Sequence, residues 1–186
     1  ARPGLDGSSG NHRIRHTSLE LNVVNAALDA IKERHRFAGF HLLGQSGQCV
    51  GMTGTDGVFV GGRMLDSGDC SGPRSARNVL AHPDVDAAVF ETARGGILRE
   101  GLGFDRCAVA VVTNIGEGDH LGLNYITTVE DLAVLKRVIV QNVAPGGHAV
   151  LNAADPIVAA MAPTCPGQIC FFTAERQHPV MAAHRA

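Results

Sequence analysis

Short apolar runs that alternate with helical patterns constrain the fold of this chain more than any other feature. Runs with the length and apolar content of buried strands lie at 48–53, 86–91, 107–114, 148–152 and 168–173. Helical patterns lie between them at 73–81, 128–143 and 156–162. Because such alternation is typical of βαβ units, we predict an α/β fold with a doubly wound, mostly parallel sheet and flanking helices.

Composition agrees with a buried parallel sheet. The apolar share is 45%, with no Trp, one Tyr and seven Phe, so the core is expected to consist of Val, Leu, Ile and Ala. A net charge of −2 gives no electrostatic reason to expect a polyanion, and we expect no nucleic-acid partner. No apolar run reaches the ~18 residues of a membrane span, and the N-terminus lacks the apolar centre of a signal peptide. We therefore expect a cytoplasmic protein with no membrane partner.

The first forty residues differ from the rest in polarity and in hydrophobic period. Residues 1–20 are polar and show no period of either kind, which predicts a loop or disordered arm. Residues 21–36 carry apolar side chains at helical spacing, which predicts a helix. We therefore divide the chain into an N-terminal arm and helix over 1–40 and one partial α/β domain over 41–186.

The five cysteines form an odd number and include no C-x-x-C pair. This pattern favours free thiols in a reducing compartment over a zinc site or a disulfide framework. Cys107 lies inside the apolar run CAVAVV and is expected to be a small core residue.

Polar side chains follow three predicted strands, at the edge where open α/β sheets bind ligands. They are Glu91, Asn114 and Asn152. If the strands at 86–90 and 107–113 are neighbours, Glu91 converges with Asp119 and His120 to offer ligands for a divalent cation. Magnesium fits better than zinc because no thiolate cluster accompanies these residues. The spacing leaves open an Asp-His pair that only caps a glycine-rich turn.

Two further segments have residue types that suit anions. Arg94 and Arg99 flank a pair of glycines, and guanidinium groups bind carboxylate or phosphate, although arginines on a surface helix give the same pattern. Ser71 and Gly72 precede Pro73 at a predicted helix start, where free N–H groups form either an anion seat or an ordinary cap.

The pattern over 128–143 predicts the clearest helix. Thr127 and Glu130 have capping-box spacing, and an apolar stripe follows that consists of Leu132, Leu135, Val138, Ile139 and Val143. Lys136 borders this stripe. The alternative is that the Lys136 stem lies along apolar surface with its ammonium in water.

Taken together, six strings resemble the Mur-ligase-like half of cyanophycin synthetases, in the same order along the chain. They are VGMTGTDGVFVGG (50–62), GDCSGPRSARNVL (68–80), ETARGGILREGLGFDRC (91–107), VTNIGEGDHLGLN (112–124), TVEDLAVLKRVIVQNV (128–143) and AVLNAADP (149–156). The resemblance implies an ATP-dependent ligase with ATP and magnesium as cofactors. In this family ATP phosphorylates a carboxylate, and arginine then attacks the acyl phosphate on Asp side chains of an Asp/Arg polymer.

The resemblance also implies roles for individual residues. Glu91 and His120 match magnesium ligands, and Lys136 matches a lysine that some relatives carry carbamylated beside a second metal. Asn152 matches an asparagine that contacts adenine. By the same resemblance we expect Lys136 and Arg94 to be catalytic, Asn152 and Asn114 to bind the nucleotide, and the substrate to be bound by Thr55, Asp56 and Ser71.

One family motif is missing. The family's phosphate-binding loop reads GTNGKTTTTR, whereas no Gly-Lys-Thr or Gly-Lys-Ser occurs in this sequence. Counting back from His41 puts Lys32 at the expected lysine, but its neighbours do not match, and Ala154 replaces the first Asp of LNADDP. We therefore expect the chain to be inactive alone.

Two rival interpretations accompany this prediction. A non-catalytic truncated or frame-disturbed fragment with residual ligand binding stays open. A dinucleotide oxidoreductase is disfavoured because no G-x-G-x-x-G follows the first predicted strand. The oligomeric state is left open.

Overall fold

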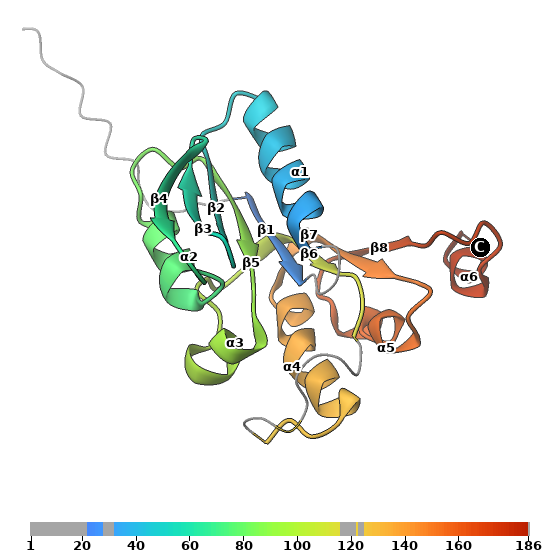
Figure 1. The fold of residues 1–186 in the computed structure, drawn as a ribbon. Helices are drawn as coiled ribbons and strands as arrows, with labels where there is room; N and C mark the ends of the chain where they lie inside the picture. The colour runs from blue at the N-terminus through green and yellow to red at the C-terminus, as the bar shows by residue number, and fades with distance from the viewer. Residues whose placement is uncertain (1–21, 28–31, 116–121, 123–124, 186) are drawn as a thin grey trace, which may run out of the picture.

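The computed structural model describes residues 22–27, 32–115, 122 and 125–185, with side chains described from residue 39 onward. The arm expected at 1–20 lies outside the described residues, as do Asp119 and His120. Within the described part the α/β prediction is confirmed: one mixed sheet carries helices on both faces (Figure 1).

The sheet has eight strands in the order β4-β3-β2-β5-β1-β6-β7-β8. They are β1 (Asn22–Ala27), β2 (Val50–Gly54), β3 (Gly57–Val60), β4 (Arg63–Ser67), β5 (Ala87–Glu91), β6 (Cys107–Val112), β7 (Val143–Asn152) and β8 (Gln168–Phe172). β3 pairs antiparallel with β2 and β4, and every other neighbouring pair is parallel. The five strands predicted from the sequence are confirmed as β2, β5, β6, β7 and β8.

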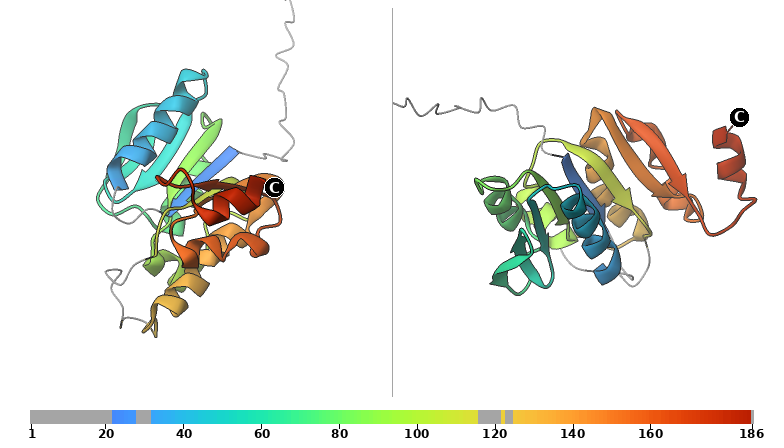
Figure 2. Two further views of the ribbon diagram at one scale, coloured as in Figure 1. Left: turned by 90° about the vertical axis from the view of Figure 1, so that its right-hand side faces the viewer. Right: turned by 90° about the horizontal axis from the view of Figure 1, so that it is seen from above.

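The helices divide unequally between the two faces of the sheet. They are α1 (Lys32–Gln45), α2 (Pro73–Leu80), α3 (Arg94–Glu100), α4 (Val129–Gln141), α5 (Pro156–Ala159) and α6 (Pro179–Arg185), with a 3-10 turn η1 (Ala162–Thr164). α1 packs on β2 and β5, and it lies across the sheet from α4 and α5 (Figure 2). The connection through α1 moves along the sheet toward β4, whereas those through α4 and α5 move toward β8. Right-handed crossovers therefore place these helices on opposite faces.

Two apolar clusters correspond to these two layers. The larger includes buried residues of β5, β6 and β7 together with Val79 of α2, Leu132 of α4 and Val158 of α5. The smaller joins Val50, Met52 and Val89 to partly buried side chains of α1. Core residues are mainly Val, Ile, Leu and Ala, as the composition predicts.

The helix predicted over 21–36 is wrong in its first half. Residues 22–27 form β1, which pairs in parallel with β5 on one side and β6 on the other. A run as short as NVVNAA cannot be assigned to helix or strand by periodicity alone. Hydrogen bonds to two neighbouring strands are a tertiary gain that outweighs the weak local helix preference. A helix does begin at Lys32, after a short connection.

The position of β1 also corrects an expectation about strand neighbours. β5 and β6 are not adjacent, because β1 lies between them. The carboxyl ends of β5 and β6 are therefore one strand farther apart than predicted, about 9–10 Å instead of about 4.8 Å.

Helix α4 is confirmed, but its cap lies one residue later than predicted. Thr128, not Thr127, is the N-cap, and its side chain accepts a hydrogen bond from the backbone N–H of Asp131. The Asp131 carboxylate completes the capping box by accepting the Thr128 backbone N–H at 3.1 Å. Leu132 and Ile139 of the predicted stripe are buried, and Val143 belongs to β7.

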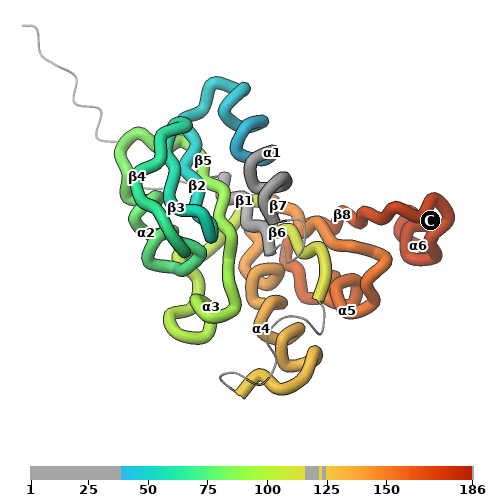
Figure 3. Tube along the Cα trace, in the orientation of Figure 1, coloured from blue at the N-terminus to red at the C-terminus, as the bar shows by residue number. Residues whose placement is uncertain are grey.

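Several elements were not predicted from the sequence. They are the β3–β4 hairpin, the short helix α3, the first half of β7, and α6, which lies beyond β8 at the edge of the sheet opposite β4 (Figure 3). Edge and connecting elements carry weak periodicity because few of their side chains are buried. No helix among the described residues is long and apolar enough to cross a membrane.

The close approach of α2 to β2 gives a stability prediction. A Cβ added at Gly51 would collide with Cγ1 of Val79 and lie 3.3 Å from Val85. We expect Gly51→Ala to lower the free energy of unfolding by about 1–3 kcal/mol, measured by urea denaturation. The control is Gly44→Ala in α1, where a Cβ meets nothing within 4 Å. It should leave stability equal or slightly higher, and equal destabilisation by both variants would contradict the packing argument.

The α4 cap gives a pH prediction. Hydrogen bonds, first from the Thr127 backbone and then from Thr128, lower the pKa of Asp131 below 3.8. A lowered folded-state pKa adds stability that is present above the unfolded pKa and is lost as pH falls through the folded pKa. Asp131→Asn should therefore reduce stability at pH 7 and flatten the acid limb below about pH 4. NMR titration of the Asp131 side chain measures the shift directly. Glu130→Gln, which removes a first-turn charge outside the capping box, should change stability at pH 7 and the acid limb less than Asp131→Asn does.

Candidate functional site

The carboxyl ends of the parallel strands meet at one edge of the sheet, and the predicted site residues form two groups there. One group lies where β2 and β5 end, and the other where β6 and β7 end. The central strand β1 separates the two groups. Glu91 and the two asparagines therefore lie at two different corners of one edge, and the predicted convergence of Glu91 with Asp119 and His120 stays a prediction because those two residues lie outside the described part.

At the β2–β5 corner a buried carboxylate is bound to backbone. Glu91, the last residue of β5, is only 5% exposed, and its Oε2 accepts the Thr55 backbone N–H at 3.1 Å. The Thr55 side chain and Asp56 are exposed on the turn between β2 and β3. Glu91 is therefore not a solvated surface charge: the turn after β2 closes directly over it.

Backbone hydrogen bonds bring a third segment to this corner. The Cys70 N–H donates to the Gly54 carbonyl at 2.9 Å, and the Ala93 N–H donates to the Ser71 carbonyl at 3.3 Å. Ser71 thus lies beside the start of α3, whose first residue is Arg94. Ser71 and Arg94, twenty-three positions apart in the sequence, are brought to the same corner by these bonds.

The Ser71 hydroxyl already has a partner. Its Oγ donates to Oδ1 of Asp69 at 2.5 Å, and its backbone N–H donates to the same oxygen at 3.1 Å. No side chain caps α2, whose N-cap is Gly72. The Asp69 carboxylate therefore lies against Ser71, next to the predicted anion seat at the start of α2, and like-charge repulsion weakens the anion-seat interpretation.

At the β6–β7 corner two asparagine side chains bind neighbouring backbone or hydroxyl groups. Asn152 donates from Nδ2 to the Thr113 carbonyl at 2.9 Å and accepts the Ala154 N–H at Oδ1 at 3.0 Å. Asn114 accepts the Thr113 hydroxyl at 3.0 Å. Both side chains are half-buried. The Asn152 amide is thereby held in one orientation, with one N–H still available to a ligand.

Lys136 is buried. It lies on α4, which packs on β6 and β7 and against α3, and it is 5% exposed. The alternative of an ammonium held out in water is wrong for this residue. Burial of a lysine is unusual because desolvation disfavours its charge, so Lys136 is set apart from the arginines at the surface.

The metal prediction is not tested by the described residues. Asp119 and His120 lie outside them, and the described part contains no group of three His, Cys, Asp or Glu side chains that could hold a metal ion. Glu91 offers the oxygen donor that magnesium prefers, and magnesium keeps most of its waters when few protein ligands are present. The donor set is compatible with that ion.

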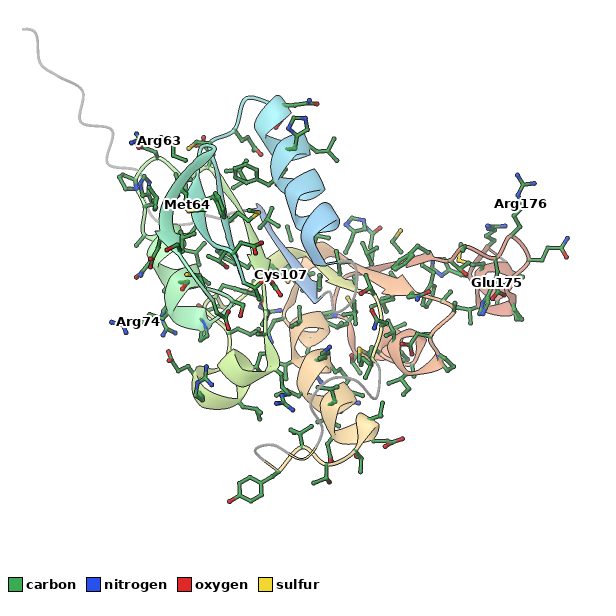
Figure 4. The ribbon with its side chains drawn as sticks, viewed as in Figure 1. Arg63, Met64, Arg74, Cys107, Glu175 and Arg176 are labelled. Carbon is green, nitrogen blue, oxygen red and sulfur yellow. The ribbon has the colours of Figure 1, made fainter. Side chains whose placement is uncertain are left out.

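The cysteines behave as predicted. All five lie in the described part, and none forms a disulfide. Cys107 lies in the interior of the fold, whereas Arg63, Arg74 and Arg176 lie at its periphery (Figure 4). Burial, with a smaller contribution from Cys165, raises the pKa of the Cys107 thiol to about 12. Cys107 is therefore an unreactive core thiol at neutral pH.

Sequence reasoning missed Asp155. Its Oδ2 accepts the Ile115 N–H at 2.8 Å, and its Oδ1 accepts the N–H groups of Ile157 and Val158 at 2.9 and 3.1 Å. An Asp directly before a Pro that opens a helix is an N-cap signal that the sequence does contain. The bond to Ile115 could not have been found in this way, because its partners are forty residues apart.

Comparison with known proteins gives one consistent family. The sequence profile of the Mur ligase middle domain matches residues 41–185. The chain is 48% identical over 144 residues to the cyanophycin synthetase of Geminocystis herdmanii and 47% identical to that of Synechocystis sp.. Each match covers 77% of this chain and 16% of the relative. The chain therefore spans about a sixth of the length of these curated relatives.

Solved structures agree on the fold. The UDP-N-acetylmuramoyl-L-alanyl-D-glutamate–2,6-diaminopimelate ligase superposes with a TM-score of 0.67 at 20% identity, over 85% of this chain and 33% of that one. A complex of FPGS with AMPPCP superposes with a TM-score of 0.57 at 16% identity, over 84% of this chain and 46% of that one. The profile match covers most of the described sheet and helices, and the chain belongs to the Mur ligase middle-domain family.

Proposed function

We propose that this chain is the nucleotide-handling domain of an ATP-dependent acid–amino-acid ligase that resembles cyanophycin synthetase and does not form amide bonds on its own. The observation that carries the proposal is the buried Glu91 carboxylate at the carboxyl end of β5, held by the Thr55 N–H. In the proposed reaction, ATP phosphorylates an Asp side chain of an Asp/Arg polymer. The amine of arginine then attacks the acyl phosphate.

We propose that the site residues at the two corners have different roles. Glu91, together with His120, would hold magnesium, which when bound neutralises phosphate oxygens. The Thr55 N–H binds Glu91, Asp56 follows Thr55 in the same turn, and backbone bonds bring Ser71 and the start of α3 at Arg94 to the same corner, which supports a substrate role for that corner. Asn114 and Asn152 form the nucleotide corner. Burial supports a specific role for Lys136.

The part of the site that would bind the phosphates differs from the family pattern. β1 lies in the middle of the sheet, α1 is the next described element after it, and Lys32 is the first residue of α1. Glu33 follows Lys32 where the family loop has a hydroxyl residue. Without that hydroxyl and the loop glycines, neither a metal ligand nor a close backbone approach to the phosphates is provided.

A prediction about nucleotide affinity follows, because the nucleotide corner is proposed to be retained and the phosphate loop to be lost. ATP with magnesium should bind this chain no more tightly than adenosine does, as measured by titration calorimetry. Asn152→Ala should weaken both ligands by the same factor, whereas Asn78→Ala, an exposed asparagine on α2, should change neither. Micromolar binding of magnesium-ATP, with adenosine far weaker, would refute the proposed loss of phosphate binding.

The activity prediction concerns the complete reaction. With arginine, a β-Asp-Arg primer and magnesium-ATP, the chain should form no amide, because in-line phosphoryl transfer needs the missing loop to position the phosphates. Mass spectrometry of the primer and ADP release measure this directly. Primer-dependent ADP release well above that of Glu91→Ala would overturn the prediction.

A second candidate is a truncated or frame-disturbed fragment with residual ligand binding. The family match begins at residue 41, and the residues before it do not carry the family's loop. Sequencing the DNA upstream of the His41 codon distinguishes the two. GTNGKTTTTR encoded in another frame would identify a disrupted synthetase.

A further inference from the structure

We propose that Asp155 is a positioning residue. Its carboxylate connects the segment after β6 to the segment after β7, and this connection, called the brace below, holds the nucleotide corner of Asn114 and Asn152 in its binding geometry. The predicted effect of the brace on nucleotide binding rests on the proposed function. The brace itself rests only on hydrogen bonds among described residues.

The carboxylate of Asp155 joins two backbone segments. Oδ2 accepts the N–H of Ile115 beyond the end of β6, and Oδ1 accepts the N–H groups of Ile157 and Val158 in the first turn of α5. The side chains of Ile115 and Val158 are buried in the same apolar cluster. The two segments that Asp155 connects are therefore both anchored to the core, and the carboxylate sets the spacing between them.

This bond begins where the sheet ladder stops. The last paired residues of β6 and β7 are Val112 and Leu151. Beyond them Asn152 bonds to the Thr113 carbonyl, and Asp155 bonds to the Ile115 N–H. Two side chains, Asn152 at the end of β7 and Asp155 at the start of α5, thus continue the hydrogen bonding beyond the last ladder pair, one on each side of Asn114.

The consequence is preorganisation of the nucleotide corner. Asn114 lies between Thr113, whose carbonyl accepts a hydrogen bond from Asn152, and Ile115, whose N–H donates to Asp155. The Thr113 carbonyl also orients the Asn152 amide. If the segment after β6 moved freely, it would have to become ordered when a nucleotide binds, and this entropic cost would lower the affinity. Polar groups that orient ligand-contacting residues typically change affinity about 10–100-fold when removed, as in metal sites.

The test separates bracing from capping. Asp155→Ser keeps an oxygen that can cap the Ile157 and Val158 N–H groups but cannot reach Ile115, whereas Asp155→Ala removes both functions. Thr128→Ala removes a comparable helix cap on α4 and leaves the corner intact. Amide hydrogen exchange of Ile115 reports the brace, and titration calorimetry with adenosine reports the corner.

For Asp155→Ser we expect a smaller loss of thermal stability than for Asp155→Ala, because the serine keeps the cap of α5 and loses only the bond to Ile115. Ile115 exchange should be about tenfold faster or more, as expected for loss of a hydrogen bond to a charged group. Adenosine affinity should be about tenfold weaker. Thr128→Ala should lower the melting temperature while adenosine affinity stays unchanged.

Two results would overturn the proposal. One is Ile115 exchange in Asp155→Ser equal to that of the parent chain, which would rule out the brace. The other is faster exchange with unchanged adenosine affinity, which would rule out a positioning role. If the parent chain itself fails to bind adenosine, the proposed function fails, while the exchange rates still decide separately whether the brace exists.

Discussion

Parallel pairing of β1 with both β5 and β6 is the interaction on which the rest of the structure depends. Without β1 the strands β4-β3-β2-β5 and β6-β7-β8 would be two separate sheets with unpaired edges. Each inner edge would leave a row of N–H and C=O groups unsatisfied. The two apolar clusters and the two corners of the sheet edge therefore have a fixed relation only because a six-residue strand lies between them.

The same strand sets what the site can do. It separates Glu91 at the end of β5 from Asn114 beyond β6, so the corner that holds Glu91 and the corner proposed to bind the nucleotide are separated by the width of one strand. A phosphate chain that extends from the nucleotide corner toward Glu91 would have to pass the end of β1. Under the proposed function, the sequence that replaces the family's phosphate loop follows β1, so the loss of that loop would leave the two proposed binding corners without a phosphate site between them.

Polar side chains at this edge are tied mainly to backbone. Glu91 is held by Thr55, Asn152 by Thr113 and Ala154, and Asp155 by three N–H groups. Buried or half-buried polar atoms need such partners, and backbone partners are rigid because the sheet and helices hold them. The corners are consequently built into the fold and do not depend on a ligand for their geometry.

The sequence by itself determined the alternation of strands and helices, the free cysteines, helix α4 and the order of motifs that resemble the family. These properties depend on residues close together in the chain, where hydrophobic period and capping chemistry act. Tertiary structure alone decided that residues 22–27 are a strand, that β5 and β6 are not neighbours, that Lys136 is buried, and that Asp155 bonds to Ile115. Each of these depends on partners far away in the sequence, and a local pattern cannot specify which distant backbone will supply a hydrogen bond or exclude water.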